Sequence, residues 1–291
     1  MNLEPREPPE FPPSWASAWG DDRHGLWADL QVAGVVQRLR WIEPGEFVMG
    51  SDPNSDASSD PDEQPAHRVR LTHGFWLANT ACTQALWQAV MGSNPSDFKA
   101  DDSRPVKRVS FEELGEFLRR LTGQWTEGCA AELPAAAEWK YACRASTAKA
   151  FNQGDELTPG QANIGAASGA SLLDQKSRSI DGSTVVARQY RANDWGLYQM
   201  YGDVFEWCTH APDAYAKTVS WNEELENPLG FQEQEPEALR AVHRESWMIV
   251  RGSDRLLFRL ADQRQAHRQG LGFRFALRSR SPETPEGETQ R

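Results

Sequence analysis

The side chains best suited to redox, nucleophilic or metal chemistry are sparse in this 291-residue chain. Its four cysteines lie far apart, without the C-x-x-C or Cys/His spacing of a metal site: Cys82, Cys129, Cys143 and Cys208. Because cysteine packs as a small hydrophobic residue, we interpret these four as buried thiols in a reducing compartment. The six histidines are also scattered, which favours structural or exposed roles; the alternative is a composite iron or copper site assembled in three dimensions.

Charge and hydropathy narrow the choice of partner and location. The formal net charge of −11 disfavours non-specific binding to nucleic acid or anionic membranes, except at a local basic patch such as the one near the C-terminus. No stretch approaches the roughly 20 apolar residues of a membrane span. The first ten residues are acidic and Pro-rich, unlike a leader peptide. These features predict a cytoplasmic protein.

The strands that would position a site follow from alternating hydrophobicity. Leu26–Val32 and Val35–Ile42 alternate apolar with polar residues across a two-residue turn, which predicts a β-hairpin. His67–Thr72 alternates in the same way and predicts a further strand. In contrast, residues 1–13 contain five prolines and little apolar content, so they predict a disordered N-terminal arm, and residues 280–291 predict a disordered tail.

Two helices are marked by their caps. Thr83 is a suitable N-cap for a helix that Gly92 ends, and apolar residues recur at helical spacing between them. Ser110, with Glu113 three residues later, matches the capping box of a second helix. A third, short helix is predicted from about residue 136 to about residue 144, followed by loops and short strands.

Many short motifs, in one order along the chain, resemble the formylglycine-generating-enzyme (sulfatase-modifying factor) family, and they cover roughly Trp41 to Ser279. They are Phe47–Ser51, Thr83–Gly92, Asn94–Phe98, Arg104–Val106, Leu133–Arg144, Gln161–Ile164, Asn193–Met200, Gly202–Cys208, Val250–Ser253 and Gly272–Arg278. The resemblance implies an α+β, C-type-lectin-like (formylglycine-generating-enzyme-like) single domain with long irregular loops. We assign it residues 14–279, with residues 14–41 as an N-terminal hairpin extension too short to bury its tryptophans unaided.

The resemblance does not extend to the chemistry for which the family is named. Its copper-dependent oxidases use two cysteines in the closing segment to bind copper and attack the substrate thiol, but the matching stretch here, Asp254–Arg268, contains no cysteine. Thiolate is both the soft ligand that Cu(I) prefers and the reacting group. We therefore expect no conventional formylglycine generation. The family's sulfoxide synthase branch takes iron ligands largely from an additional helical domain, for which no segment here is long enough.

The resemblance also implies calcium as a structural cofactor, bound through clustered oxygens. The matching positions in two motifs of the family are the side chains or carbonyls of Asn163, Ile164, Asp203, Val204 and Glu206. Either Asp174 or Asp181 would supply the remaining acidic ligand of the second site, which contains Asn163 and Ile164. The alternative is that Asp203 and Glu206 satisfy hydrogen-bond donors in a turn.

The closing segment is the exposed ligand face in the lectin-like fold, and variable proteins of diversity-generating retroelements diversify it. Residues 253–270 here combine Arg, aromatic and amide groups suited to protein recognition. These residues are Asp254, Arg255, Leu257, Phe258, Arg259, Gln263, Arg264, Gln265, His267 and Arg268. We therefore predict a non-catalytic domain that binds a protein or small-molecule ligand through this segment, against the simpler interpretation of a solvated basic turn.

Two other functions remain as alternatives. One is a metal-dependent (iron or copper) oxidase, or a protein- or peptide-modifying enzyme, whose site uses histidines or carboxylates in place of thiolates. The other is an accessory subunit whose fold bridges partners.

Overall fold

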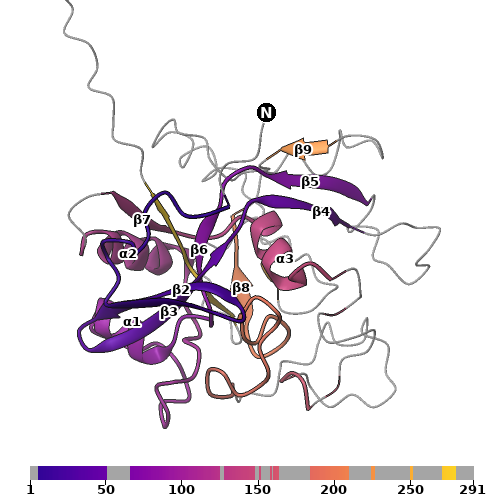
Figure 1. Ribbon diagram of the computed structural model, residues 1–291. Coiled ribbons are helices and arrows are strands. Elements are labelled where there is room, and N and C mark those ends of the chain that lie inside the picture. Colours follow the sequence, from indigo (N-terminus) through magenta and orange to yellow (C-terminus); the bar gives the residue numbers. More distant parts are fainter. Residues whose placement is uncertain are drawn as a thin grey trace, which may run out of the picture.

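The computed structural model describes residues 6–50, 66–124, 128–147, 151, 158, 160–163, 184–209, 224–226, 250–251 and 271–279. Its largest element is a six-stranded sheet that contains strands from both ends of this range (Figure 1). The strand order is β1 (Ala18–Asp22), β2 (Gly25–Val32), β3 (Val35–Ile42), β6 (Phe75–Ala78), β12 (Ala276–Ser279) and β7 (Cys129–Glu132). All five pairings are antiparallel. The last strand in sequence, β12, is not at an edge of the sheet but lies between β6 and β7.

Two smaller sheets and three helices complete the described structure. One sheet has the order β4 (Gly45–Met49), β5 (His67–Leu71) and β9 (Glu224–Glu226). The other has the order β10 (Val250–Arg251), β8 (Phe205–Trp207) and β11 (Leu271–Phe273). The helices are α1 (Gln84–Met91), α2 (Phe111–Thr122) and α3 (Ala136–Arg144). Mixed sheets with few helices agree with the predicted α+β class, whereas the C-type-lectin-like label stays a prediction. Among these helices, none has the length and apolarity needed to cross a membrane.

The predicted hairpin and helix caps are confirmed. β2 and β3 pair in register from Trp27–Arg40 to Val32–Val35, as the alternation predicted. Thr83 Oγ1 accepts the Leu86 N–H at 3.2 Å, and the left-handed Gly92 ends α1. Ser110 and Glu113 form the reciprocal capping box of α2. Local signals were sufficient for these elements because each partner lies within a few residues in sequence.

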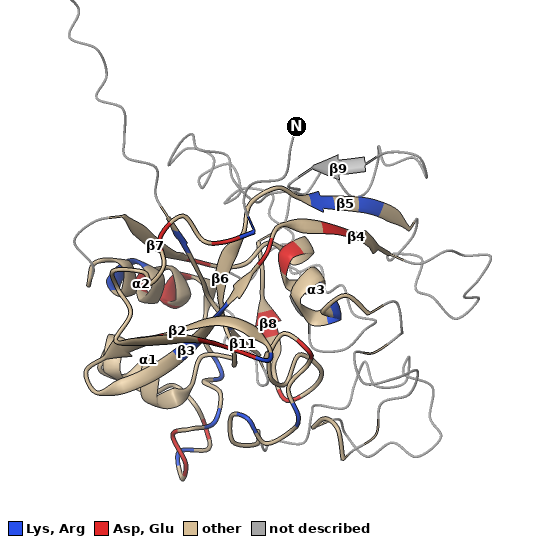
Figure 2. Ribbon diagram, in the orientation of Figure 1, with Lys and Arg blue, Asp and Glu red and all other residues tan. Residues whose placement is uncertain are grey.

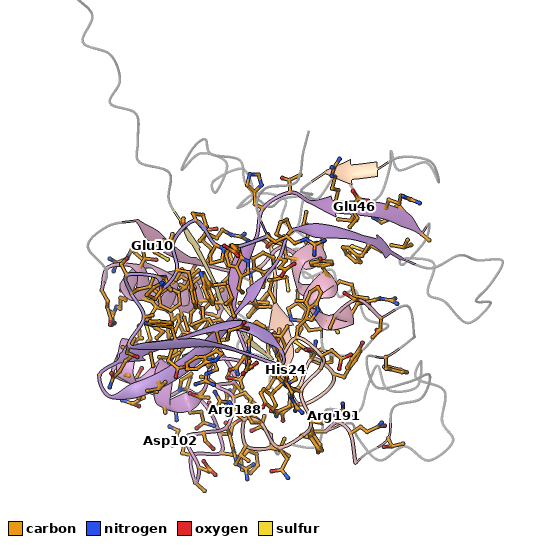
Figure 3. The ribbon with its side chains drawn as sticks, viewed as in Figure 1. Glu10, His24, Glu46, Asp102, Arg188 and Arg191 are labelled. Atoms are coloured by element: carbon orange, nitrogen blue, oxygen red, sulfur yellow. The ribbon has the colours of Figure 1, made fainter. Side chains whose placement is uncertain are left out.

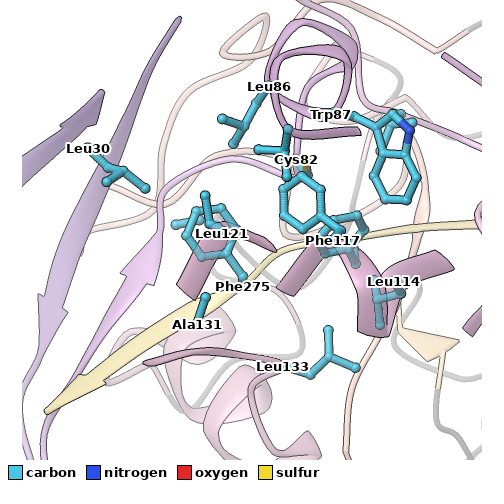
Figure 4. Close-up of a cluster of buried hydrophobic side chains, with 14 of the residues drawn as sticks. Leu30, Cys82, Leu86, Trp87, Leu114, Phe117, Leu121, Ala131, Leu133 and Phe275 are labelled. Atoms are coloured by element: carbon cyan, nitrogen blue, oxygen red, sulfur yellow. The ribbon is translucent and has the colours of Figure 1, made fainter. Parts of the chain in front are cut away.

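Two hydrophobic cores lie within the fold. The first packs the six-stranded sheet against α1 and α2, with Trp87 stacked on Phe117 at 5.1 Å between ring centroids and Phe273 edge-on to Phe117 at 5.1 Å (Figure 4). The second surrounds α3 and the strands β4 and β5, where Tyr141 meets Trp195 edge-on at 4.8 Å. Many of the chain's tryptophans are therefore anchors between elements, as their large apolar area favours.

The N-terminal arm corrects one expectation. Residues 6–13 were predicted to be disordered, but Phe11 stacks on Trp76 at 6.3 Å between ring centroids, and the Trp41 indole N–H donates to the Arg6 carbonyl at 2.6 Å. The prediction was wrong for these residues because one aromatic side chain, with its neighbouring prolines, finds a tryptophan-lined surface that composition does not reveal. Residues 1–5 and the predicted tail 280–291 lie outside the described residues.

The predicted N-terminal extension is continuous with the main sheet. β3 pairs with β6 as well as with β2, so the extension is part of the domain and not a unit beside it. Trp15 lies edge-on to Trp76 at 5.7 Å, which ties the start of the extension to the first core.

The turn of the β2–β3 hairpin generates a stability prediction. Ala33 and Gly34 have φ values of 48° and 85°, as a two-residue type I′ turn requires, and Ala33 is exposed. Left-handed backbone is unfavourable for alanine but tolerated by asparagine. Ala33→Asn should therefore raise the free energy of unfolding by roughly 0.5–1 kcal/mol in urea titrations. An unchanged denaturation midpoint would show that this turn is not strained.

Candidate functional site

A small sheet of three short strands includes the two strands that flank residues 252–270 in sequence. β8 lies between β10, which is antiparallel to it, and β11, which is parallel to it. Arg251 and Gly272 are both partners of Glu206, from opposite sides, so about 10 Å, or two strand spacings, separates them. The register places the end of β10 and the start of β11 at the same end of β8, next to Phe205. Both ends of the segment are therefore anchored to one strand.

The predicted ligand-binding residues themselves lie outside the described residues. All ten, from Asp254 to Arg268, belong to the segment that β10 and β11 flank. The described residues thus define the three-stranded base to which the two ends of this segment connect, and the recognition role of its side chains stays a prediction.

A buried ion pair lies directly beneath this base. Arg274 Nε and Nη2 donate to the two Glu206 carboxylate oxygens at 2.6 and 2.7 Å, and the two side chains are 0% and 2% exposed. Arg274 also donates to the carbonyls of Ala78 and Tyr198, at 3.3 and 3.1 Å. Trp139 Nε1 donates to Glu206 at 2.8 Å. The pair therefore connects β6, β8, α3 and the loop that carries Tyr198. Figure 2 shows β8, with its acidic residue in red, near the centre of the ribbon.

A second buried carboxylate, Asp203, precedes β8 and organises the loops around it. Asp203 Oδ1 accepts from Asn163 Nδ2 at 3.0 Å and from the Val185 N–H at 2.9 Å, while Oδ2 accepts from Gln199 Nε2 at 2.8 Å. We call these four residues the Asp203 network. Burial raises the pKa of the Asp203 carboxyl, and the three hydrogen bonds oppose that shift.

The structure brings together two of the predicted calcium-binding residues. Asn163 bonds to Asp203, and an isolated bridge joins Asn163 to Gly202. Glu206 instead has both oxygens occupied by Arg274 and Trp139, which matches the alternative in which it satisfies hydrogen-bond donors. Val204 is buried beside Gly272, and Ile164 lies outside the described residues. Asp174 and Asp181 lie outside them too.

Other described residues offer little support for a redox metal or a reactive thiol. No group of three or more His, Cys, Asp or Glu side chains in the described part of the chain is arranged to hold a metal ion. All four cysteines are described, and no disulfide joins any of them. Burial raises the pKa of the Cys82 thiol well above its usual value, so that residue stays protonated and unreactive at neutral pH.

Sequence reasoning missed two charged residues of this region. Lys107 is only 3% exposed, its ammonium nitrogen lies 5.1 Å from the centre of the Phe98 ring, and burial lowers its pKa against the attraction of Asp97 and Asp203. Arg274 belongs to one of the family motifs, and its position between Phe273 and Phe275, in the short connection from β11 to β12, is a signal for a buried ion pair. No comparable signal marks Lys107, because its burial depends on loops distant in sequence.

Taken together, the fold and this region define a single α+β domain that presents a long connection from a small three-stranded sheet. The model of the sulfatase-modifying factor enzyme 1-like domain family matches residues 31–279. The chain therefore belongs to this family. β1 and most of β2 precede the match, so the first part of the N-terminal extension is additional to the family domain.

Curated relatives are similar over part of the chain. A formylglycine-generating enzyme of Streptomyces coelicolor is 32% identical over 142 residues, which cover 46% of this chain and 41% of that enzyme. The chaperone protein LppX of Paenibacillus barcinonensis is 28% identical over 214 residues, which cover 60% of this chain and 71% of LppX. The chain thus spans less than half the length of the formylglycine-generating enzyme.

Two solved structures share the fold. Treponema denticola variable protein 1 superposes with a TM-score of 0.64 at 19% identity, covering 86% of this chain and 98% of that protein. PvdO from Pseudomonas aeruginosa superposes with a TM-score of 0.57 at 18% identity, covering 90% of this chain and 98% of PvdO. At these identities the likeness defines the fold alone.

The ion pair beneath the small sheet generates a prediction. Arg274→Met should lower the free energy of unfolding by about 3–5 kcal/mol, because it leaves the Glu206 charge buried without a partner. Adding Glu206→Gln should recover part of this loss, since the amide removes the charge and still accepts from Trp139. Urea titration of the single and double variants measures both effects. A single variant as stable as the wild type would contradict a structural role for the pair.

Proposed function

We propose that this chain is a non-catalytic recognition domain of its family, which binds a protein or small-molecule ligand through residues 253–270. The observation that carries the proposal is that the strands on either side of this segment, β10 and β11, both pair with β8, whose Glu206 forms the buried ion pair with Arg274. A rigid base that holds a long connection is the usual arrangement for presenting a binding loop. Arginine, phenylalanine and amide side chains supply the recognition chemistry.

The sequence of the segment supports binding over thiol oxidation. No cysteine follows Cys208 in the chain, so no thiol is available within residues 253–270. Of the four described thiols, those of Cys82, Cys143 and Cys208 are buried, and that of Cys129 is half-buried in β7, a strand of the six-stranded sheet. Similarity to a formylglycine-generating enzyme over 142 residues keeps a modifying enzyme as the second candidate, with a site built from other side chains.

We also propose a structural calcium ion at the Asp203 network. Asp203 carries carboxylate oxygens of the kind that calcium prefers, and this carboxylate is buried without an ion pair among the described residues; the adjacent Asn163 has a side-chain amide oxygen besides the nitrogen that now donates to Asp203. Glu206 is better assigned to its ion pair with Arg274. Calcium would neutralise the Asp203 charge, whose burial is otherwise unfavourable.

The absence of any disulfide supports the proposed cytoplasmic location.

A triple substitution tests the recognition segment. Arg255→Ala, Phe258→Ala and Arg264→Ala together should abolish capture of partners from the native lysate, measured by quantitative mass spectrometry, with a nearly unchanged melting temperature.

The matched control removes similar side chains from elsewhere on the surface. Arg119, Arg120 and Val36 are exposed, with side-chain exposures of 71% and 45% for the two arginines and a residue exposure of 53% for the valine. Their triple alanine variant should retain capture. If the first variant captures the same partners as the wild type, recognition does not use this segment.

Calcium makes a separate prediction. Millimolar calcium should raise the melting temperature of protein stripped with a chelator, because a ligand that binds only the folded state stabilises it. The increase should be smaller for Asp203→Asn, which keeps an acceptor but loses the charge. Magnesium at the same concentration controls for ionic strength. Equal responses of both proteins would remove the Asp203 network as the calcium site.

A further inference from the structure

Arg188 has an unusual backbone for its residue type. It lies in the loop between Val185 and Tyr198 and has φ 67°, in the left-handed region that favours glycine. Its side chain is exposed, and Figure 3 labels it on the lower edge of the molecule with Arg191. A strained residue persists only where its surroundings hold it in place, so the contacts around Arg188 indicate what the strain secures.

Three left-handed, non-glycine residues are linked to one another at this point. The Arg188 N–H donates to Gln199 Oε1 at 2.7 Å, and Gln199 Nε2 donates to Asp203 Oδ2 at 2.8 Å. Gln199 and Asp203 have φ values of 49° and 67°. The buried Asp203 network thus extends through one glutamine side chain to the backbone of an exposed arginine. This chain of hydrogen bonds fixes the direction in which the Arg188 side chain leaves the loop.

The Arg188 guanidinium stands over an aromatic ring with its charge unneutralised. Its central carbon lies 5.9 Å from the centre of the Tyr198 ring, and Nη2 makes one long contact of 3.5 Å to Asn79 Oδ1. Within the described part of the chain, no carboxylate forms an ion pair with it.

Arg38 is a useful comparison, because a carboxylate neutralises its guanidinium. Its guanidinium lies 3.6 Å from the centre of the Trp27 ring, and Nε and Nη2 donate to the two Asp29 oxygens at 2.7 and 2.9 Å. Asn79 lies between the two segments, because its N–H donates to the Arg38 carbonyl at 2.9 Å and its side chain accepts from Arg188. Arg38 has its carboxylate from within the chain, whereas Arg188 lies farther from its ring, at 5.9 Å, and has no carboxylate partner among the described residues.

We propose that Arg188, supported by Tyr198, is the anchor of a second binding site, which takes an oxyanion group of a ligand, a carboxylate or a phosphate. The planar guanidinium presents parallel N–H donors that match either group, and among the described residues its one side-chain hydrogen bond is the long contact of Nη2 to Asn79. The net charge of −11 makes general attraction of anions unfavourable, so binding depends on this local geometry. The site is independent of the proposed role of residues 253–270.

Titration of the full chain with acetate and with inorganic phosphate, at constant ionic strength, tests the site. The readout is the NMR signal of the Arg188 Nε–H group, assigned by its loss in Arg188→Lys. Both ions should shift this signal with saturation, and the ion with the higher affinity identifies the source as carboxylate or phosphate. Arg188→Lys keeps the charge but not the paired donors, so neighbouring backbone signals should report at least about tenfold weaker binding.

Two further variants separate recognition from folding and from general charge. Arg188→Gly relieves the left-handed backbone, so it should lose binding while its melting temperature stays equal or rises. Arg191→Ala removes an exposed arginine from the same loop and should retain binding within about twofold, because rim charges contribute little. Equal loss in the Arg191 variant, or no saturable shift with either ion, would overturn the proposal.

Discussion

The ion pair between Glu206 and Arg274 is the interaction on which the arrangement of the described elements depends. Neither side chain reaches solvent, and their partners come from separate parts of the sequence: the end of β6, β8, α3 and the Tyr198 loop. Two buried charges are costly unless each has its full set of hydrogen bonds, so these elements are held to positions that satisfy the pair. Apolar contacts alone would allow neighbouring elements to shift relative to one another.

The Asp203 network applies the same constraint to the loops. A buried carboxylate needs donors, and here they come from Asn163, Val185 and Gln199, on segments that form no helix or long strand. Irregular backbone is thus ordered by polar contacts to one side chain. This explains how a chain with long loops maintains a defined surface at the edge of its sheets.

The sequence was sufficient for elements whose signals are local. The β2–β3 hairpin and the caps of α1 and α2 were predicted because alternation, Thr83 and the Ser110–Glu113 pair act within a few residues. The order of the six-stranded sheet was not predicted, since the pairing of β12 with β6 joins residues about 200 positions apart, beyond any periodicity argument.

The candidate site was predictable in part, for the same reason. Motif resemblance identified Asn163, Asp203 and Glu206, and the structure joins the first two while giving Glu206 to Arg274. The left-handed backbone of Arg188 could not be predicted from the sequence, because glycine is the residue that indicates such a conformation and none stands at this position. Family membership, similarly, describes the fold and leaves open which chemistry its surface carries.

The geometry around β8 has an evolutionary consequence. Since β10 and β11 pair with opposite edges of β8 at the same residue, Glu206, the distance between them is set at about two strand spacings, whatever number of residues connects them. The entropy of closing such a loop grows only slowly with added residues. By this measure alone, adding or removing residues between the two strands should change the free energy of folding little, so this connection is a position where evolution or protein engineering can vary the sequence.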